Sequence, residues 1–274
     1  MTPDNQDEIR GEVRAHYGQV ARTGGSCCGP TCCAPGTPAT TGDASEAARR
    51  IGYSSDELSA VPEGANLGLG CGNPQAIAAL RPGVTVVDLG SGGGFDCFLA
   101  ARQVGPQGRV IGVDMTPDMI TRARQNAAQT PHRNVEFRLG EIEHLPVADQ
   151  TADAIMSNCV INLSPDKATV FSEAFRVLRP GGRLAISDVV ARGPLPENIR
   201  KDLALYTGCV AGAATIAETE QLLREAGFVD IRVTVDEAAS AAMAEMAPGQ
   251  GLAAMAASAS IEARRPAAAG GARA

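Results

Sequence analysis

The stretch Val84-Thr-Val-Val-Asp-Leu-Gly-Ser-Gly-Gly-Gly-Phe-Asp-Cys-Phe98 decides the fold of this chain. Its apolar start, which leads to Asp88, predicts an interior strand of a parallel sheet. The glycines that follow allow a sharp turn and a close approach of the backbone to a ligand, and a helix begins after them. A strand, a glycine turn and a helix N-terminus together predict a nucleotide-binding corner. The pattern Asp-x-Gly-x-Gly-x-Gly matches the dinucleotide fingerprint only in part.

Alternating strands and helices continue along the chain. Between the strands, apolar residues recur with the 3.6-residue period of a helix. The same period predicts an amphipathic helix over residues of about 6–22 that packs on the domain. This order predicts an α/β protein with a Rossmann-like, mainly parallel sheet of seven strands, flanked by helices with right-handed crossovers. The further strands are predicted at residues 109–114, 134–139, 152–157, 183–190, 228–235 and 257–264.

Composition limits the classes of protein to which the chain can belong. Its 274 residues suffice for one large α/β domain with an extension, or for two small domains. The net charge of −7 argues against polyanion binding, because a basic surface is the usual footprint of that function. No apolar run approaches the roughly 18 residues of a membrane span. Since the polar, acidic N-terminus also does not match a secretory signal, we expect a cytoplasmic protein.

Four of the eight cysteines lie in one Gly- and Pro-rich loop, at Cys27, Cys28, Cys32 and Cys33. In a cytoplasmic protein, reduced thiols, metal ligands or redox groups are the better interpretation than a permanent disulfide framework. Adjacent Cys-Cys pairs crowd a tetrahedral zinc centre, which favours a thiol-rich lid that binds or reduces something soft. A zinc site and a disordered segment whose thiols have no role are the alternatives.

Two acids follow the glycine corner at positions that suit a nucleoside. Asp114 ends the second strand, 20 residues after Gly94, where a carboxylate accepts hydrogen bonds from ribose hydroxyls. Its alternative role is to cap the next helix. Glu141 comes just past the third strand and is a candidate partner for an adenine amino group, with an ordinary loop carboxylate as the alternative.

Three further cysteines lie where the fold can bring them to this corner. Cys71 lies between glycines in Gly70-Cys-Gly-Asn-Pro74, which predicts a thiol on a loop rather than in a core. Cys159 follows the fourth strand, at the edge of the sheet where ligands bind. Cys209 lies among small residues near the end of a later helix. Cys97 lies inside the first helix of the core and is predicted to be a packed, inert thiol.

These motifs resemble those of class I S-adenosylmethionine-dependent methyltransferases and, among them, of bacterial arsenite methyltransferases. The general signals are the glycine corner, Gly112-Val-Asp-Met-Thr116 and Gly140-Glu-Ile-Glu143. The more specific signals contain thiols and are Cys71-Gly-Asn-Pro74, Ser157-Asn-Cys-Val-Ile-Asn-Leu-Ser164 and Gly208-Cys-Val-Ala-Gly212. The similarity extends over residues of roughly 5–235.

The resemblance implies a substrate and a cofactor. Cys159, Cys209 and Cys71 would bind trivalent arsenic, as arsenite or methylarsenite, and an upstream thiol, Cys27 or Cys28, would assist. An external thiol, glutathione or thioredoxin, would be the reductant, and we expect a monomer with no nucleic-acid or membrane partner. S-adenosylmethionine would be held by Asp88, Gly90, Ser91, Gly92, Asp114, Met115, Glu141, Ile142 and Asn158.

The resemblance also divides the chain. Residues 1–66 would form the N-terminal helix and Cys-rich extension, and residues 67–193 the methyltransferase core. Residues 194–266 would contribute to arsenic binding and complete the sheet, with residues 267–274 as a disordered tail.

Two other functions fit parts of the pattern. A methyltransferase for a quinone or another small organic acceptor would use the same corner but would have no need of paired thiols. A non-catalytic arsenic-binding protein would need the thiols but neither the glycine loop nor Asp114.

Overall fold

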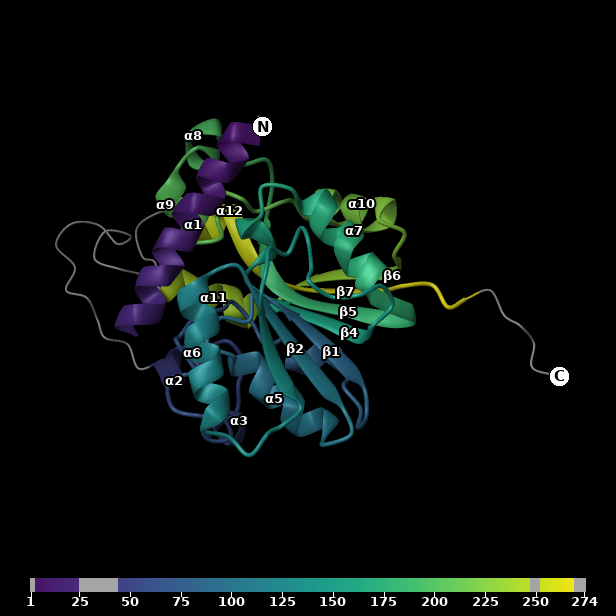
Figure 1. Ribbon diagram of the computed structural model, residues 1–274. Coiled ribbons are helices and arrows are strands. Elements are labelled where there is room, and N and C mark those ends of the chain that lie inside the picture. The colour runs from purple at the N-terminus through teal and green to yellow at the C-terminus, as the bar shows by residue number, and fades with distance from the viewer. Residues whose placement is uncertain (1–2, 25–43, 247–251, 269–274) are drawn as a thin grey trace.

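The computed structural model describes residues 3–24, 44–246 and 252–268, and its centre is a twisted sheet with helices on both faces (Figure 1). The sheet has seven strands in the order β3-β2-β1-β4-β5-β7-β6, and β7 runs in the direction opposite to the other six. The predicted Rossmann-like fold is therefore confirmed. The strands are β1 (Thr85–Leu89), β2 (Arg109–Asp114), β3 (Val135–Leu139), β4 (Ala152–Asn158), β5 (Leu178–Ala191), β6 (Val229–Val235) and β7 (Ala256–Arg264).

The helices cover the sheet in two layers, with further helices at its carboxyl edge. Those before and within the first half of the fold are α1 (Pro3–Thr23), α2 (Ala44–Arg50), α3 (Ser55–Ser59), α4 (Gln75–Ala78), α5 (Phe95–Val104) and α6 (Pro117–Ala128). Those that follow are the 3-10 turn η1 (Ile161–Leu163), α7 (Lys167–Val177), α8 (Glu197–Arg200), α9 (Leu203–Thr207), α10 (Ile216–Glu225), α11 (Glu237–Met246) and α12 (Leu252–Met255).

Strand β1 is interior because its side chains are buried on both faces. Val87 and Leu89 pack with Phe171 of α7, whereas Val86 packs on the opposite face with Phe98 of α5. Successive strand residues point to opposite faces, so an unbroken apolar run is what a strand between two helical layers requires. Both neighbours of β1, β2 and β4, run parallel to it. Their carboxyl ends therefore meet at one edge of the sheet.

Strand β5 begins earlier than the sequence predicts. We expected Arg179-Pro-Gly-Gly182 to separate a helix from a strand that starts at residue 183, but β5 starts at Leu178, directly after α7. The pairing of β4 with β5 shifts register between Ala152 and Ala154, so the extra residues are accommodated as a bulge. Gly181 has φ of 81°, a conformation that glycine adopts without the strain a side chain would add.

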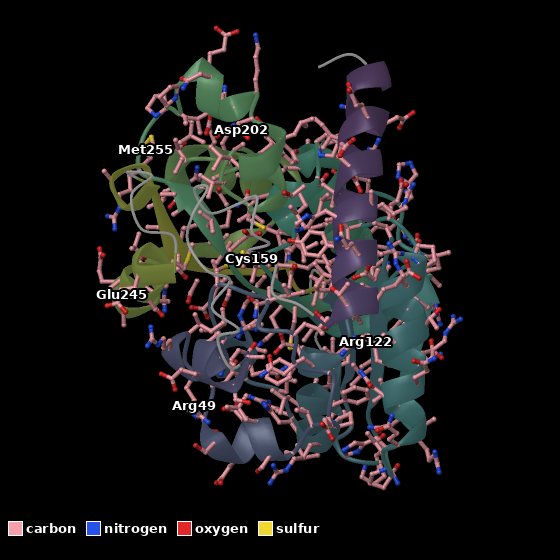
Figure 2. The ribbon with its side chains drawn as sticks, turned by 90° about the vertical axis from the view of Figure 1, so that its left-hand side faces the viewer. Arg49, Arg122, Cys159, Asp202, Glu245 and Met255 are labelled. Atoms are coloured by element: carbon pink, nitrogen blue, oxygen red, sulfur yellow. The ribbon has the colours of Figure 1, made fainter. Side chains whose placement is uncertain are left out.

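The N-terminal helix α1 crosses the carboxyl edge of the sheet, beside α6 and α9 (Figure 1). Its residues Ile9, Val13 and Tyr17 pack in one cluster with Cys159, which Figure 2 shows in the middle of the molecule beside this helix. The helix predicted over residues 6–22 is confirmed. Across the described ranges, no helix combines the length and the apolar character that crossing a membrane requires.

We predict that Phe171→Ala lowers the free energy of unfolding by about 3–5 kcal/mol, because it removes a ring that is 2 % exposed between α7 and the sheet. Urea unfolding followed by circular dichroism measures this change. Leu139→Ala is the control: this side chain is 52 % exposed, so its loss should change stability by less than about 0.5 kcal/mol. Equal losses for the two variants would contradict the assignment of the core.

Candidate functional site

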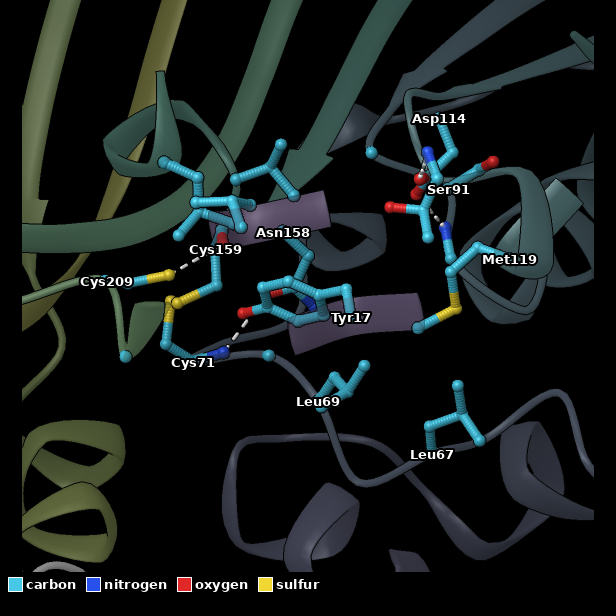
Figure 3. A pocket seen from close by; sticks show the side chains of 18 of the residues that line it. Tyr17, Leu67, Leu69, Cys71, Ser91, Asp114, Met119, Asn158, Cys159 and Cys209 are labelled. Carbon is cyan, nitrogen blue, oxygen red and sulfur yellow. Dashed lines mark hydrogen bonds between the residues drawn. The ribbon is translucent and has the colours of Figure 1, made fainter. Parts of the chain in front are cut away.

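A cavity of about 640 Å³ opens at the carboxyl edge of the sheet, beneath α1. This size is typical of sites for small molecules and cofactors, which collect at this edge in open α/β sheets. Figure 3 shows the cavity from close by, with the thiols on one side and Asp114 and Ser91 on the other. Most of the predicted site residues line it: Asp88, Gly90, Ser91, Gly92, Asp114, Met115, Ile142, Asn158, Cys71, Cys159 and Cys209.

The glycine turn forms one wall of the cavity. The backbone N–H groups of Gly90 and Ser91 both donate to the carbonyl of Val113, at 2.8 and 3.0 Å, which ties the turn to β2. Gly90 has φ of 71°, and a Cβ built there would lie 2.3 Å from the side chain of Val160. Only glycine therefore fits between the end of β1 and the loop after β4.

Asp114 lies at the end of β2 and is held in place by backbone donors. Its carboxylate accepts one hydrogen bond from the N–H of Gly92, at 2.9 Å, and one from the N–H of Thr116, at 2.8 Å. Burial raises the pKa of this carboxyl above its usual value, although both backbone donors lower it. The acid thus fixes the backbone just before α6 and also lines the cavity, while its contact with ribose hydroxyls stays a prediction.

A buried hydroxyl in the turn indicates a missing polar partner. The Oγ atom of Ser91 is buried and has no hydrogen-bond partner among the described residues. Buried polar groups are normally satisfied, so an exception in a cavity wall is the kind of group that a ligand completes. Ser91 and the Asp114 carboxylate therefore fit the polar part of a nucleoside ligand.

Asp88 lies at the end of β1, and its carboxylate accepts a hydrogen bond from the thiol of Cys97, at 3.2 Å. Burial raises the pKa of Asp88 well above its usual value, and the nearby Asp96 raises it further. Cys97 is fully buried in α5, as predicted, and burial followed by the charge of Asp88 raises the pKa of its thiol well above the usual value.

Glu141 is not among the described residues that line the cavity, although the sequence made it a candidate for cofactor binding. Its carboxylate pairs with Arg14 of α1, at 3.1 Å. Of the described residues just past β3, the two that line the cavity are Ile142 and Glu143. Glu143 is buried, accepts a hydrogen bond from Ser164 Oγ at 2.7 Å and lies 3.3 Å from the guanidinium of Arg10.

Cys71 is buried, contrary to the expectation of a loop thiol outside the core. Its loop folds inward because glycines flank it: a Cβ at Gly70 would lie 2.9 Å from the amide of Asn158, and one at Gly72 would lie 2.9 Å from Ser187. The side-chain carbonyl of Asn158 accepts from the N–H of Cys71, at 3.1 Å, while its NH₂ group donates to the carbonyl of Gly72, at 2.8 Å. Local glycine content therefore indicated close packing rather than exposure.

Cys159 and Cys209 share an unusual backbone conformation. Their φ angles are 59° and 64°, in the left-handed region that side chains other than glycine and asparagine rarely adopt. The thiol of Cys209 donates to the carbonyl of Cys159, at 2.9 Å, and the N–H of Cys159 donates to the carbonyl of Ser187. Backbone strain of this kind concentrates at functional sites.

The three thiols meet at one end of the cavity, and the sulfurs of Cys71 and Cys159 point toward one another (Figure 3). These two sulfurs and a carboxylate oxygen of Asp188 lie within 4.8 Å of one another. Burial raises the pKa of Cys71 to about 11. Contact with Cys159, and then burial, raises the pKa of Cys209 well above its usual value. The hydrogen bond from Cys209 lowers the pKa of Cys159, but the contact with Cys71 and burial outweigh it and leave that pKa well above its usual value.

Sequence reasoning missed the part that α1 plays. Arg10, Val13 and Tyr17 line the cavity, and the hydroxyl of Tyr17 donates to the carbonyl of Thr207, at 3.0 Å. The apolar stripe of this helix was visible in the sequence, but its packing partner was not. The predicted accessory thiols Cys27 and Cys28, with Cys32 and Cys33, lie outside the described residues.

Comparison with known proteins identifies the family. Residues 80–227 match the model of a methyltransferase domain. The chain is 48% identical to an arsenite methyltransferase of Halobacterium salinarum over 95% of its own length and 68% of that protein. The chain belongs to the arsenite methyltransferase family. It is also 33% identical to the arsenite methyltransferase of Mus musculus, of whose length it spans 61%.

A solved structure supports the same family. An arsenic(III) S-adenosylmethionine methyltransferase from Chlamydomonas reinhardtii superposes with a TM-score of 0.61 and 35% identity, covering 83% of this chain and 75% of the other. A phosphoethanolamine N-methyltransferase of Haemonchus contortus, in complex with S-adenosyl-L-methionine, reaches a TM-score of 0.61 at 19% identity and shares the fold alone. The chain is thus an S-adenosylmethionine-dependent methyltransferase of the arsenite type.

We predict that Gly212→Ala separates the loops of Cys159 and Cys209. A Cβ at Gly212 would lie 2.1 Å from the carbonyl oxygen of Asn162, so one loop must move. We expect a loss of about 1–3 kcal/mol of stability and weaker arsenite binding, measured by chemical unfolding and titration calorimetry. Gly193→Ala is the matched control, since nothing lies within 4 Å of its Cβ position. Unchanged arsenite affinity in Gly212→Ala would contradict this account.

We also predict slow alkylation of Cys71 in the arsenite-free protein at neutral pH. Only the thiolate reacts, and with a pKa of about 11 the logarithm of the rate should rise by about one unit per pH unit from pH 8 to 10. Iodoacetamide labelling followed by mass spectrometry measures the rate at each pH. If the alkylation rate reached a plateau near pH 9, as expected for an ordinary thiol, burial would not be raising the pKa of Cys71.

Proposed function

We propose that this chain methylates trivalent arsenic that is bound by Cys71, Cys159 and Cys209. The observation that carries the proposal is the meeting of three thiols, two of them buried, at one end of the cavity whose other end is the glycine turn. Arsenic(III) is soft and thiophilic, so sulfur ligands are the fitting ones. A methyltransferase for a small organic acceptor would have no use for a thiol cluster at this place.

The cofactor site is built from the glycine turn and the ends of β1 and β2. We propose that Asp114 accepts hydrogen bonds from ribose hydroxyls and that Ser91, whose hydroxyl lacks a partner among the described residues, completes the polar wall. Ile142 and Met115 contribute apolar contacts from the same cavity wall. When bound, S-adenosylmethionine supplies a methyl group attached to a positively charged sulfur.

The thiols capture arsenite without a general base. Each exchange joins one thiol to arsenic and releases one hydroxyl as water, so the thiol proton leaves in that water. High thiol pKa values are therefore compatible with the reaction. The left-handed backbone at Cys159 and Cys209 brings two of the sulfurs to the cavity end, so that binding fixes the arsenic in place. Holding two reactants in position is the main catalytic contribution that we propose.

The arsenic lone pair is the nucleophile and forms the bond to the methyl carbon. This step raises arsenic formally to the pentavalent state. Cys71 and Cys159 can then leave as a disulfide while arsenic takes up the electron pair, because their sulfurs point toward one another (Figure 3). The methylarsenic(III) cation that remains on Cys209 binds a water molecule, which loses a proton, so the product is neutral. An external thiol, glutathione or thioredoxin, would reduce that disulfide by exchange. Cys27 or Cys28 would pass electrons between them, in a protein that acts as a monomer.

The test is arsenic speciation after incubation with arsenite, S-adenosylmethionine and a thiol. We predict methylated arsenic from the unmodified protein and a loss of at least about 100-fold in rate for Cys159→Ser and Cys209→Ser, since misplaced reactants lose about that much. Cys97→Ser is the matched control, because it removes a buried thiol that lies outside the cluster and can still donate to Asp88. The absence of methylated arsenic from the unmodified protein would refute the proposal.

A further inference from the structure

Asp188 is a buried carboxylate directly behind the thiol cluster. It belongs to β5 and is 1 % exposed, and one of its oxygens lies within 4.8 Å of the sulfurs of Cys71 and Cys159. The described residues that line the cavity include both cysteines but not Asp188, so this carboxylate does not itself face the cavity. Burying an ionised carboxylate is costly unless donors satisfy it, so its presence needs an explanation.

Donors from the Cys159 loop and from the neighbouring residue of β5 hold this carboxylate in place. It accepts hydrogen bonds from the N–H of Ile161 at 2.9 Å, the side-chain NH₂ of Asn162 at 2.9 Å and the N–H of Val189 at 2.7 Å. The positive charge of Lys167 also acts on it. Burial raises the pKa of Asp188 to about 6 against these contacts, so the group is mostly ionised at neutral pH, and its hydrogen bonds fix its direction before any substrate arrives. Such preorganisation is what makes a charge effective in catalysis.

A negative charge has the wrong sign for a site that only needs reactive thiols. Asp188 contributes to the raised pKa of Cys71, Cys159 and Cys209, which opposes formation of thiolates. A neutral side chain that accepts hydrogen bonds would hold the same loop without this penalty. The charge is therefore explained better by a later stage of the reaction than by capture of the substrate.

The charge balance of the proposed reaction identifies that stage. Arsenic(III) bound to three cysteine sulfurs is electrically neutral. Its lone pair then forms the As–C bond while the C–S bond of the sulfonium breaks and leaves its electron pair on sulfur. The positive charge thereby moves from the sulfonium sulfur to the arsenic. The arsenic would lie next to the sulfurs that Asp188 approaches, so the carboxylate faces the atom at which positive charge develops.

We propose that Asp188 accelerates methyl transfer by stabilising the positive charge that develops on thiol-bound arsenic. The inference rests on the proposed function, since it assigns a residue to that reaction. Asp188 acts through the electric field at the arsenic and makes no bond to it. Its second role, holding the Cys159 loop through Asn162, would by itself affect binding of arsenite rather than the rate of the bound complex.

The experiment compares Asp188→Asn with Asn162→Ala. Asp188→Asn removes the charge, and we expect kcat to fall by about 10²-fold, the loss typical when one preorganised electrostatic group is removed, with arsenite affinity within about threefold of the original. Asn162→Ala keeps the charge and weakens the loop, so it should raise KM for arsenite more than it lowers kcat. Asp188→Glu, which retains the charge, should recover part of the lost kcat.

A second measurement detects the charge of Asp188 in the absence of methyl transfer. Loss of a neighbouring negative charge should lower the pKa of the thiols, so the pH profile of Cys71 alkylation should shift toward lower pH in Asp188→Asn but not in Asn162→Ala. If Asp188→Asn does not fold, Asp188→Ser, which also removes the charge, is measured in its place.

An unchanged kcat in the charge-free variant would overturn the inference, as would a loss explained entirely by weaker arsenite binding. An unmodified protein without arsenite methylation would instead reject the proposed function, so the two failures are distinguishable.

Discussion

The side-chain amide of Asn158 is the contact on which the arrangement of the site depends. It stands at the end of β4, accepts from the N–H of Cys71, and donates to the carbonyl of Gly72 and to the hydroxyl oxygen of Tyr53, at 3.0 Å. One planar group thus joins the central strands to a loop that lies 87 residues earlier in the chain. Because these partners are buried or nearly so, loss of the amide would leave several polar groups unsatisfied.

The loops that carry Cys159 and Cys209 combine a strained backbone with contacts that compensate for the strain. Cys159 and Cys209 adopt left-handed backbone conformations, which cost of order 1–3 kcal/mol each for residues other than glycine. Hydrogen bonds from the Cys159 loop to Asp188, and the close approach of Gly212 to Asn162, offset that cost. The rigid core of the sheet therefore stabilises a conformation that neither loop would adopt alone.

Much of this structure could be predicted from local patterns. The glycine turn, the acid that ends β2 and the alternation of strands with helices follow from residue types at short spacing, and Cys159 follows from its place after β4. Three features could not be predicted because long-range packing decides them. Glu141 turns to Arg14 on α1, Cys71 is buried by contacts with Asn158, and Tyr17 comes to the cavity from the far N-terminal helix.

The same burial that makes the thiols poor nucleophiles favours arsenic over competing metal ions. Capture of arsenite by thiols releases water and leaves the charge of the site unchanged, so burial does not oppose it. A divalent cation binds thiolates and must expel one proton from each thiol. With the pKa of Cys71 at about 11, that expulsion is unfavourable at neutral pH. A cluster of protonated thiols is thus better suited to neutral arsenic(III) than to zinc, although both elements favour sulfur ligands.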